Sequence, residues 1–401
     1  MTTTSDRQAA TIDLPGLDET LQAFGESRML PGAAYTSDEV FAWEQRHLFA
    51  GQYTCVGRED ELRAPGEEGK ALTQRAVKVG DVHVLLTWDG DDIHAFANTC
   101  RHRAHELVEA DAGNAKRAIV CPYHAWTYDL SGSLRAAPGY KGNDTFDAEN
   151  HGLVELPVER WQGWVFVHAA TSLASGEALP FTEYIGELDR FVSAYDPASL
   201  VLGDRHSYVV EANWKVISEN YHECYHCPLI HPELCQVTPP TSGDNLDLPG
   251  AWLGGTMILR DGMQTMSLTG ESNGRPIPGV DPTTVLYAGL VPNLLISAHP
   301  DYVMTHRLVP LEPGKTWVEC SWYVPATGEG EEPIDATYAV EFWDLTNKQD
   351  WNACESVQRG LASPHFHAGP FSPSEDAVHM FVTTVARAYR GLPIHHPAGN
   401  L

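Results

Sequence analysis

Basic residues are scarce in this chain of 401 residues. It holds 26 Lys and Arg against 54 Asp and Glu, which gives a formal net charge of −28 at pH 7. No run of consecutive Lys and Arg residues interrupts this acidic excess, although a nucleic-acid-binding surface needs a basic patch. The sequence therefore predicts no nucleic-acid partner.

Long apolar runs are also missing. Asp, Glu, Gly or Pro interrupts every apolar stretch before it reaches the ~18–20 residues that cross a bilayer, so we expect no membrane association. Residues 1–30 lack the basic start and the apolar run that mark a secretory signal. The eight cysteines are scattered over the chain. Together these features predict a cytoplasmic protein with reduced thiols.

Histidine, in contrast, is abundant, with 19 residues beside the eight cysteines. The chain is longer than the ~100–200 residues of a typical domain, so one large domain or two medium ones are expected. Neither an internal repeat nor a low-complexity tract is found. The spacing of the histidines and cysteines must therefore decide whether they serve a chemical purpose.

The region 51–170 consists of short β-rich runs separated by turn residues, including 76–79, 82–88 and 161–168. The segments 88–93 and 130–134 have the composition of hairpin turns. Beyond residue 172 the pattern mixes expected helices (180–195, 214–225, 334–361) with expected strands (207–212, 256–259, 285–290, 294–298, 302–310, 316–324). A short helix is also expected at 37–46. This organisation predicts an all-β domain followed by an α+β domain.

The first cluster of candidate ligands combines Cys100-x-His102 with Cys121-x-x-His124. Each pair lies in a short loop between β runs, so two thiolates and two imidazoles can meet at one inorganic centre. A Cys2His2 set is also a tetrahedral zinc site. Zinc fingers, however, pair Cys with Cys and His with His, whereas each loop here carries one of each. The mixed pairing favours a [2Fe-2S] cluster with both cysteines on one iron and both histidines on the other, and the segment resembles the Rieske domain.

The second cluster begins with His222-Glu223-Cys224-Tyr225-His226, which matches the His-Glu-x-x-His pattern of zinc metalloproteases. Pro228 follows the second histidine after one residue, and the Gly and third His of the extended protease pattern are not at their places. A zinc metalloprotease that uses His222, Glu223 and His226 is therefore a remote alternative.

His226 and His231 offer a different site, because they lie five residues apart on either side of Pro228 and can converge on one metal. With one carboxylate they form the two-histidine, one-carboxylate triad of non-haem Fe(II) oxygenases, which leaves positions open for dioxygen. The segment resembles the catalytic domain of Rieske non-haem iron oxygenase alpha subunits in its pattern Asn213-Trp214-Lys215 … Glu219-Asn220 … Glu223-x-Tyr225-His226-x4-His231.

The third ligand is expected in the helix 334–361. Asp350, Cys354, Val357 and Leu361 share one face of that helix. An acid on an apolar stripe must be paired or must bind metal, because an isolated buried carboxylate is costly. A buried acid paired with Arg or Lys stays open as an alternative. The resemblance to the family signature around Cys354-Glu355-x-Val357-Gln358 implies that Asp350 is the ligand.

The resemblance implies an α+β fold: an all-β Rieske domain (51–170) and a helix-grip-like α+β catalytic domain (171–401) with a central antiparallel sheet, on which an N-terminal segment (1–50) packs. It also implies a terminal oxygenase that uses a [2Fe-2S] Rieske cluster, mononuclear Fe(II) and O2. A pure electron carrier would have only the first pair of loops. The chain has no Gly-x-Gly-x-x-Gly fingerprint, so electrons from NAD(P)H are expected through a separate flavin and iron-sulfur reductase.

In the resembled family the carboxylate at Glu223 links a cluster histidine of the neighbouring subunit to an iron ligand. The resemblance therefore implies a cyclic homotrimer, with Glu223 as a catalytic residue beside His226, His231 and Asp350. His222 and Cys224 are expected to pack or hydrogen-bond nearby, and Cys227 and Cys235 are interpreted as ordinary buried thiols.

Segments 219–228 and 289–297 resemble the branch of the family that acts on glycine betaine, stachydrine and other quaternary ammonium compounds. This resemblance implies a monooxygenase that hydroxylates a betaine-type substrate, with loss of an N-methyl group as formaldehyde. Aromatic faces hold such cations, and Trp252, Tyr287 and Phe366 are the candidate binding residues. Hydroxylation or dihydroxylation of an aromatic substrate, by a dioxygenase with the same centres, is the alternative.

Overall fold

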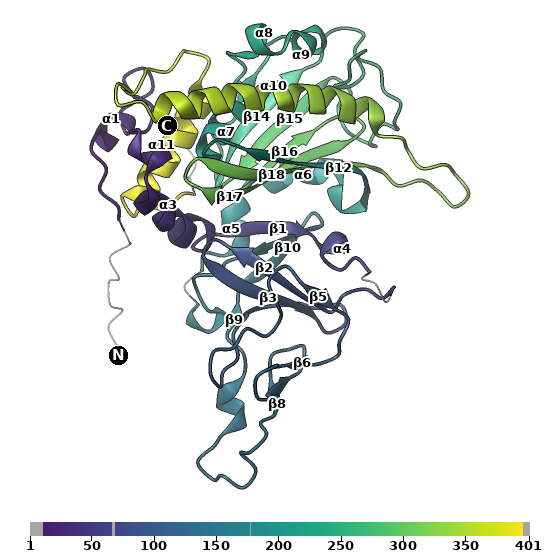
Figure 1. The fold of residues 1–401 in the computed structure, drawn as a ribbon. Coiled ribbons are helices and arrows are strands. Elements are labelled where there is room, and N and C mark those ends of the chain that lie inside the picture. The colour runs from purple at the N-terminus through teal and green to yellow at the C-terminus, as the bar shows by residue number, and fades with distance from the viewer. Residues whose placement is uncertain (1–10, 66–68, 177, 396–401) are drawn as a thin grey trace. The chain divides into compact units, whose positions relative to one another are not determined.

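The computed structural model describes residues 11–65, 69–176 and 178–395. The chain divides into two compact units (Figure 1): a smaller unit, Glu44–Phe181, and a larger unit, Met1–Trp43 with Thr182–Leu401. Within the described ranges, no helix is both long enough and apolar enough to cross a membrane.

The smaller unit is built from three antiparallel sheets, in the strand orders β5-β2-β3-β4-β9, β1-β11-β10 and β6-β7-β8. This agrees with the predicted all-β domain. The strands are β1 (Thr54–Arg58), β2 (Gln74–Val79), β3 (Val82–Trp88), β4 (Ile93–Ala97), β5 (Gly113–Asn114), β6 (Ile119–Val120), β7 (Thr127–Tyr128), β8 (Leu134–Ala136), β9 (Glu155–Leu156), β10 (Val158–Trp161) and β11 (Trp164–Val167), and the short helix α4 covers Glu59–Leu62.

Both hairpin predictions in this unit are confirmed, since β3 pairs with β4 and β7 pairs with β8. The single run expected at 161–168 is wrong, because the chain reverses inside it. Gln162 (φ 51°) and Gly163 (φ 87°) both have positive φ, as the two central residues of a type I′ turn require. Trp161 and Trp164 are consequently paired across the hairpin between β10 and β11.

Two apolar clusters hold the smaller unit together. The first lies between the five-stranded sheet and the β1-β11-β10 sheet, and it includes Val84, Leu86, Trp88 and Val165. The second contains Cys100 and Cys121 together with Leu85, Phe96, Leu107, Ile119, Trp126 and Tyr128. The two candidate cysteine ligands are thus anchored in a packed core.

The larger unit contains a seven-stranded antiparallel sheet in the order β12-β18-β17-β16-β15-β14-β13. The strands are β12 (Leu200–Val210), β13 (Asp244–Asn245), β14 (Trp252–Ile258), β15 (Thr284–Leu290), β16 (Leu294–Ala298), β17 (Val303–Glu312) and β18 (Lys315–Pro325). The predicted α+β class with a central antiparallel sheet is confirmed. The strand β16 has the expected bounds, and the bounds of β15, β17 and β18 differ from expectation by one or two residues. In contrast, β12 and β14 begin seven and four residues earlier than expected, and β13 was not expected.

The long helix α10 (Thr337–Leu361) runs along the sheet (Figure 1). It contacts α7 (Trp214–Tyr221) and β12, and α11 (Asp376–Tyr389) contacts α7 and β14. The remaining helices are short: α1 (Leu17–Thr20), α2 (Ala33–Thr36), α3 (Asp38–Glu44), α5 (Phe181–Ile185), α6 (Leu188–Val192), α8 (Cys227–Ile230) and α9 (Pro232–Val237). The stretch expected to be helical at 180–195 is divided between α5 and α6, because Gly186 adopts a positive φ of 49°.

One face of α10 points into the larger unit. Cys354 and Leu361 are buried on this face, as expected from their spacing, but Val357 is 44% exposed. The predicted apolar stripe is therefore interrupted after Cys354, and the inward face that matters for Asp350 is the stretch N-terminal to that residue.

Candidate functional site

The segment that carries the candidate histidines is built from two helices with a break between them. The side chain of Asn213 accepts a hydrogen bond from the backbone N–H of Lys215 (2.9 Å) and so caps α7. The helix ends at Tyr221, four residues earlier than expected, and α8 begins at Cys227. Pro228 lies in the first turn of α8, where its missing N–H costs nothing. Glu223 and His226 therefore both lie in the break between the two helices, although Glu223 was expected inside the first one.

Glu219 fixes α7 against the N-terminal segment, because its Oε1 accepts a hydrogen bond from the hydroxyl of Tyr35 (2.7 Å). Burial raises the pKa of Glu219 from its ordinary value of 4.5 to about 7, although the Tyr35 hydrogen bond and the charge of Lys215 act in the opposite direction. The folded chain therefore holds this proton more tightly than the unfolded chain does.

Glu219→Gln is expected to reduce the pH dependence of stability. With a raised folded-state pKa, the contribution of Glu219 is fully present below pH 4.5 and is lost as the pH rises through about 7, at most roughly 3 kcal/mol. Urea unfolding at about pH 5 and about pH 8 measures it: the variant should gain stability relative to the wild type at the higher pH. Parallel profiles for the two proteins would contradict this assignment.

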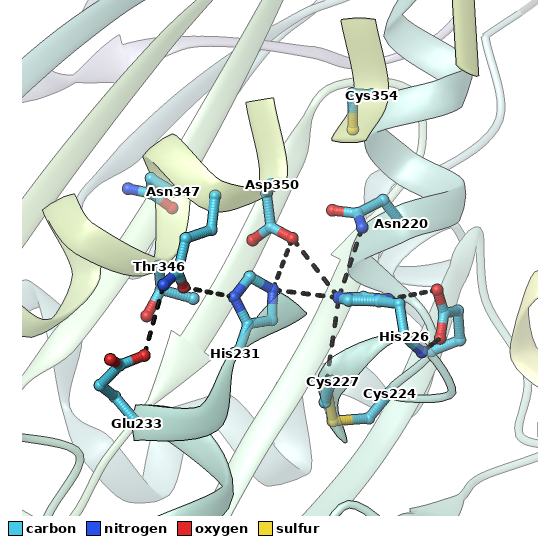
Figure 2. A network of polar contacts seen from close by, with 12 residues as sticks. Asn220, Cys224, His226, Cys227, His231, Glu233, Thr346, Asn347, Asp350 and Cys354 are labelled. Carbon is cyan, nitrogen blue, oxygen red and sulfur yellow. Dashed lines mark hydrogen bonds and ion pairs between the residues drawn. A yellow bond between two sulfur atoms is a disulfide. The ribbon is translucent and has the colours of Figure 1, made fainter. Parts of the chain in front are cut away.

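The structure brings His226, His231 and Asp350 together at one point (Figure 2). Nε2 of His231 lies 2.8 Å from Oδ1 of Asp350 and 3.1 Å from Nε2 of His226, and Nε2 of His226 lies 3.4 Å from the same Asp350 oxygen. Their possible ligand atoms all lie within 4.8 Å of one another. Asp350 comes from α10, and the histidines flank α8.

The hydrogen-bond partner of Nδ1 identifies the tautomer of each imidazole. Nδ1 of His226 contacts Oε1 of Glu223, and Nδ1 of His231 lies 2.7 Å from Oε1 of Gln349. Because a carboxylate and an amide oxygen only accept, both Nδ1 atoms carry the proton. Both Nε2 lone pairs and a carboxylate oxygen then face one another, an arrangement that needs a cation between them. The residues present therefore fit a metal ion with two histidine ligands and one carboxylate ligand.

The pKa shifts agree with this electron-rich arrangement. Burial by itself would raise the pKa of Asp350, but the hydrogen bonds and charges of His226 and His231 outweigh it and hold the pKa below its usual value. Burial by itself would lower the pKa of His226, but the bonds to Asp350 and Glu223 raise it to about 9. Both shifts show a site that stabilises added positive charge.

Two carboxylates orient the imidazoles, and only one of them was expected from the sequence. Glu223 holds His226 directly, and its Oε2 also accepts from the backbone N–H groups of Tyr225 and His226. His231 is held through Gln349, whose Nε2 donates to Oε2 of Glu233 (3.3 Å). Sequence reasoning missed Gln349 and Glu233, although the position of Gln349 directly before Asp350 was an available signal.

Gln349→Leu is expected to weaken binding of the mononuclear metal by about 10- to 100-fold, because His231 Nδ1–H loses its acceptor and the ring loses its orientation. Metal retention against a graded chelator measures the effect. The matched control is Asn352→Leu, which changes an exposed side chain on the same helix. Equal retention in the two variants would show that Gln349 does not position His231.

The metalloprotease alternative is wrong. Nδ1 of His222 lies 2.6 Å from the backbone oxygen of Ser218, and its ring stacks on Phe381 with centroids 5.7 Å apart. His222 is not part of the metal-type group, and Glu223 is occupied by His226. The helix that the protease pattern requires ends at Tyr221.

The interpretation of Cys227 as a free buried thiol is also wrong. Cys224 and Cys227 form a disulfide with a Cα–Cα distance of 4.9 Å (Figure 2), so the expectation of reduced thiols fails at this pair. Sγ of Cys227 lies 4.0 Å from Nε2 of His226. Cys235 is free, as expected, but only half-buried.

The candidate metal site opens into a cavity of about 790 Å³ in the larger unit. Tyr287 lines this cavity, but Trp252 and Phe366 do not. The indole N–H of Trp252 donates to the backbone oxygen of Pro249 (3.0 Å) in the core, and Phe366 lies beside Gly32. Their aromatic character alone did not indicate which way they face. The aromatic residues that do line the cavity are Phe24, Tyr221, Tyr225, Tyr287, Trp343 and Trp351.

In the smaller unit, the two candidate loops have the same backbone design. Ala104 and Ala125 both have positive φ, and the N–H of each donates to the carbonyl of the cysteine four residues earlier, Cys100 or Cys121, at 3.0 Å. This tight turn presents one cysteine and one histidine per loop.

The cysteines and histidines of these loops lie at different depths. Cys100 and Cys121 are each 2% exposed, and burial together with the neighbouring Cys100 raises the pKa of Cys121. The rings of His102 and His124 lie 4.7 Å apart, nearer the surface. Two buried sulfurs on one side and two imidazoles on the other fit a [2Fe-2S] cluster ligated by both pairs.

Two further residues support this site, and neither role was expected from the sequence. The hydroxyl of Tyr128 lies 3.4 Å from Sγ of Cys100 and accepts from the N–H of Arg101 (3.1 Å). The ring of Trp126 stacks on His102 with centroids 5.0 Å apart. Such contacts fix the orientation of ligands and modulate the metal that they bind.

A pair of Cys-His loops and a partly buried two-histidine, one-carboxylate group define the class of iron-dependent terminal oxygenases. Two family models match the chain: the Rieske [2Fe-2S] domain at residues 52–147 and the catalytic domain of the ring hydroxylating alpha subunit at residues 197–391. The chain belongs to the Rieske non-haem iron oxygenases, a family of oxidoreductases.

Similar proteins act on quaternary ammonium compounds. The glycine betaine monooxygenase oxygenase subunit of Chromohalobacter salexigens is 29% identical, over 86% of this chain and 81% of that protein. The chloroplastic choline monooxygenase of Spinacia oleracea is also 29% identical, over 88% and 76%. A solved quaternary ammonium Rieske monooxygenase in complex with L-carnitine has a TM-score of 0.71 at 26% identity, over 94% of this chain and 99% of that one.

Proposed function

We propose that the protein is a terminal oxygenase that hydroxylates a small quaternary ammonium compound, most simply at an N-methyl carbon. The observation that carries the proposal is the position of the His226, His231 and Asp350 group at an aromatic-lined cavity. A cavity of about 790 Å³ has the size of a small-molecule site. The names of the similar proteins support the cation as the substrate class.

The proposal assigns iron to both sites. His226, His231 and Asp350 hold the mononuclear Fe(II), and Cys100, His102, Cys121 and His124 hold the Rieske cluster. When bound, the cluster supplies single electrons and the mononuclear iron supplies the dioxygen chemistry. Glu223 acts on the reaction by orienting His226.

The overall reaction follows from these parts. One oxygen atom of O2 enters a C–H bond of the N-methyl group and the other leaves as water, with two electrons and two protons consumed. The resulting hydroxymethyl ammonium compound loses formaldehyde and a proton, as the C–N electron pair returns to nitrogen. The electrons come from NAD(P)H through a separate flavin and iron-sulfur reductase.

The chain itself supplies the binding surface. The ring centroids of Tyr221 and Tyr287 lie 6.0 Å apart at an interplanar angle of 70°, and those of Tyr287 and Trp343 lie 6.5 Å apart at 68°. Crossed aromatic faces at these distances attract a quaternary ammonium group. The indole N–H of Trp343 is already used, since it donates to the hydroxyl of Tyr302 (2.7 Å), so this ring offers its π face.

We further propose a cyclic homotrimer in which Glu223 links His226 to a cluster histidine of the neighbouring subunit. Inter-subunit electron transfer has been described for a similar solved structure, a quaternary ammonium Rieske monooxygenase that oxidises carnitine. The contact of Glu223 with His226 Nδ1 supports this link. Tyr225 and Leu229 lie close to Glu223 and His226 in the chain and are 65% and 90% exposed, which supports a contact of this surface with a neighbouring subunit.

NADH-driven oxygen uptake with a broad-acceptance reductase tests the proposed function. The substrates are glycine betaine, proline betaine, carnitine, choline and simple aromatic acids, and the products are formaldehyde or an aldehyde. We expect a quaternary ammonium compound to stimulate uptake with matching product. Stimulation only by an aromatic acid would instead establish the alternative, and an assay without substrate corrects for uncoupled reduction of O2.

A further inference from the structure

The cavity wall is strongly one-sided in charge. Four carboxylates line it, those of Glu223, Asp244, Asp350 and Asp376, and none of the described residues that line it is Lys or Arg. Glu223 and Asp350 are committed to the histidines. Asp244 and Asp376 are not, and neither forms an ion pair with a basic side chain of the described chain. A cation entering the cavity is attracted, and an anionic group is repelled.

Asp376 also occupies the N-terminus of α11, which would otherwise attract an anion. It lies in the first turn of α11, and the N-terminus of a helix favours negative charge. The preceding Glu375 accepts a hydrogen bond from the backbone N–H of Ser372, and Asp376 accepts one from Asn245 Nδ2 (2.7 Å). The amide of Asn245 and the N–H of Ser372 are therefore already bound by carboxylates of the protein itself.

We propose that the substrate is a small quaternary ammonium cation without a free carboxylate, such as a quaternary ammonium alcohol, and that Asp244 and Asp376 exclude inner-salt substrates. This inference rests on the proposed function and narrows it, because it separates choline-type cations from glycine betaine and carnitine. The aromatic rings of Tyr287 and Trp343 would hold the ammonium group, and the acidic wall would select against the carboxylate.

Isothermal titration calorimetry of the oxidised, metal-loaded enzyme under argon tests the proposal without turnover. The decisive pair is glycine betaine and its primary amide, which has nearly the same shape and keeps the ammonium group but lacks the negative charge. Choline is the third ligand. We expect the amide and choline to bind at least about tenfold more tightly than glycine betaine, with a gap that narrows as salt is added.

Variants locate the effect in the wall. Asp244→Asn with Asp376→Asn should raise the affinity for glycine betaine and lower that for choline, while Asp247→Asn, an exposed acid outside the cavity, should leave the ratio unchanged. Glycine betaine binding as tightly as its amide in the wild type would overturn the inference, and an unchanged ratio in the double variant would overturn the roles of Asp244 and Asp376. If no quaternary ammonium compound binds but an aromatic acid does, the proposed function itself fails.

Discussion

Asp350→Ala is expected to abolish substrate oxidation, with a loss of at least about 10²-fold, while the visible spectrum of the Rieske cluster stays unchanged. Oδ1 of Asp350 faces Nε2 of both His231 (2.8 Å) and His226 (3.4 Å). Without it, two neutral imidazoles are the only ligands that the described chain contributes at this point. The candidate cluster ligands belong to the separate unit Glu44–Phe181. The metal content of the cluster site should therefore not change.

Iron per chain and substrate-dependent oxygen uptake measure this prediction together. Glu341→Ala, which removes an exposed acid from the same helix, is the matched control and should behave like the wild type. Full turnover in Asp350→Ala would show that this carboxylate is not a ligand. A loss of the cluster spectrum as well would point to misfolding, and Asp350→Asn, which keeps the size of the side chain, would then separate structure from ligation.

Glu223→Gln is expected to slow product formation by about 10- to 100-fold while both metal sites stay occupied. The two oxygens of Glu223 accept from His226 Nδ1 and from the backbone N–H groups of Tyr225 and His226. Gln offers one acceptor oxygen and a second group that can only donate, so one of these contacts becomes a clash of donors. The orientation of His226 and the proposed link to the neighbouring cluster should both suffer.

The informative measurement for Glu223→Gln is the rate at which the reduced cluster is reoxidised in the presence of substrate and O2. A slow rate with normal iron content supports the proposed role in electron delivery. Glu223→Asp, which keeps the charge on a shorter side chain, should recover part of the rate, and Glu271→Gln, an exposed position, should have no effect. Wild-type reoxidation in Glu223→Gln would remove that role.

Local spacing carried the ligand predictions, because it limits which side chains can converge. His226 and His231 meet although the preceding helix ends earlier than predicted, since α8 and its flanking residues still place both rings on one side. Asp350 lies more than one hundred residues further along the chain. Its prediction as the third ligand depended on its place in a long helix, which the sequence indicated well. The break at Tyr221 did not follow from the pattern, because residues 222–226 contain no strong helix breaker.

Contacts between distant segments could not be predicted from the sequence. The pairing of Gln349 with His231 and Glu233 depends on how α10 approaches α9, and the contact of Tyr128 with Cys100 depends on how two β loops pack. The residues that line the cavity could not be predicted either. Trp343 lines the cavity although its position in an expected helix did not single it out, whereas the candidate Trp252 is a core residue. Burial and direction, rather than residue type, separate the two.

A single-turnover experiment examines the proposed oxygenase activity without any reductase. The enzyme is reduced chemically, freed of reductant and mixed with O2 and a quaternary ammonium compound that binds, and the product is quantified against reoxidised cluster. We expect formaldehyde or the corresponding aldehyde in nearly stoichiometric amount, with no product from Asp350→Ala. Reoxidation of a fully metal-loaded enzyme without oxidation of any bound quaternary ammonium compound would contradict the proposed function.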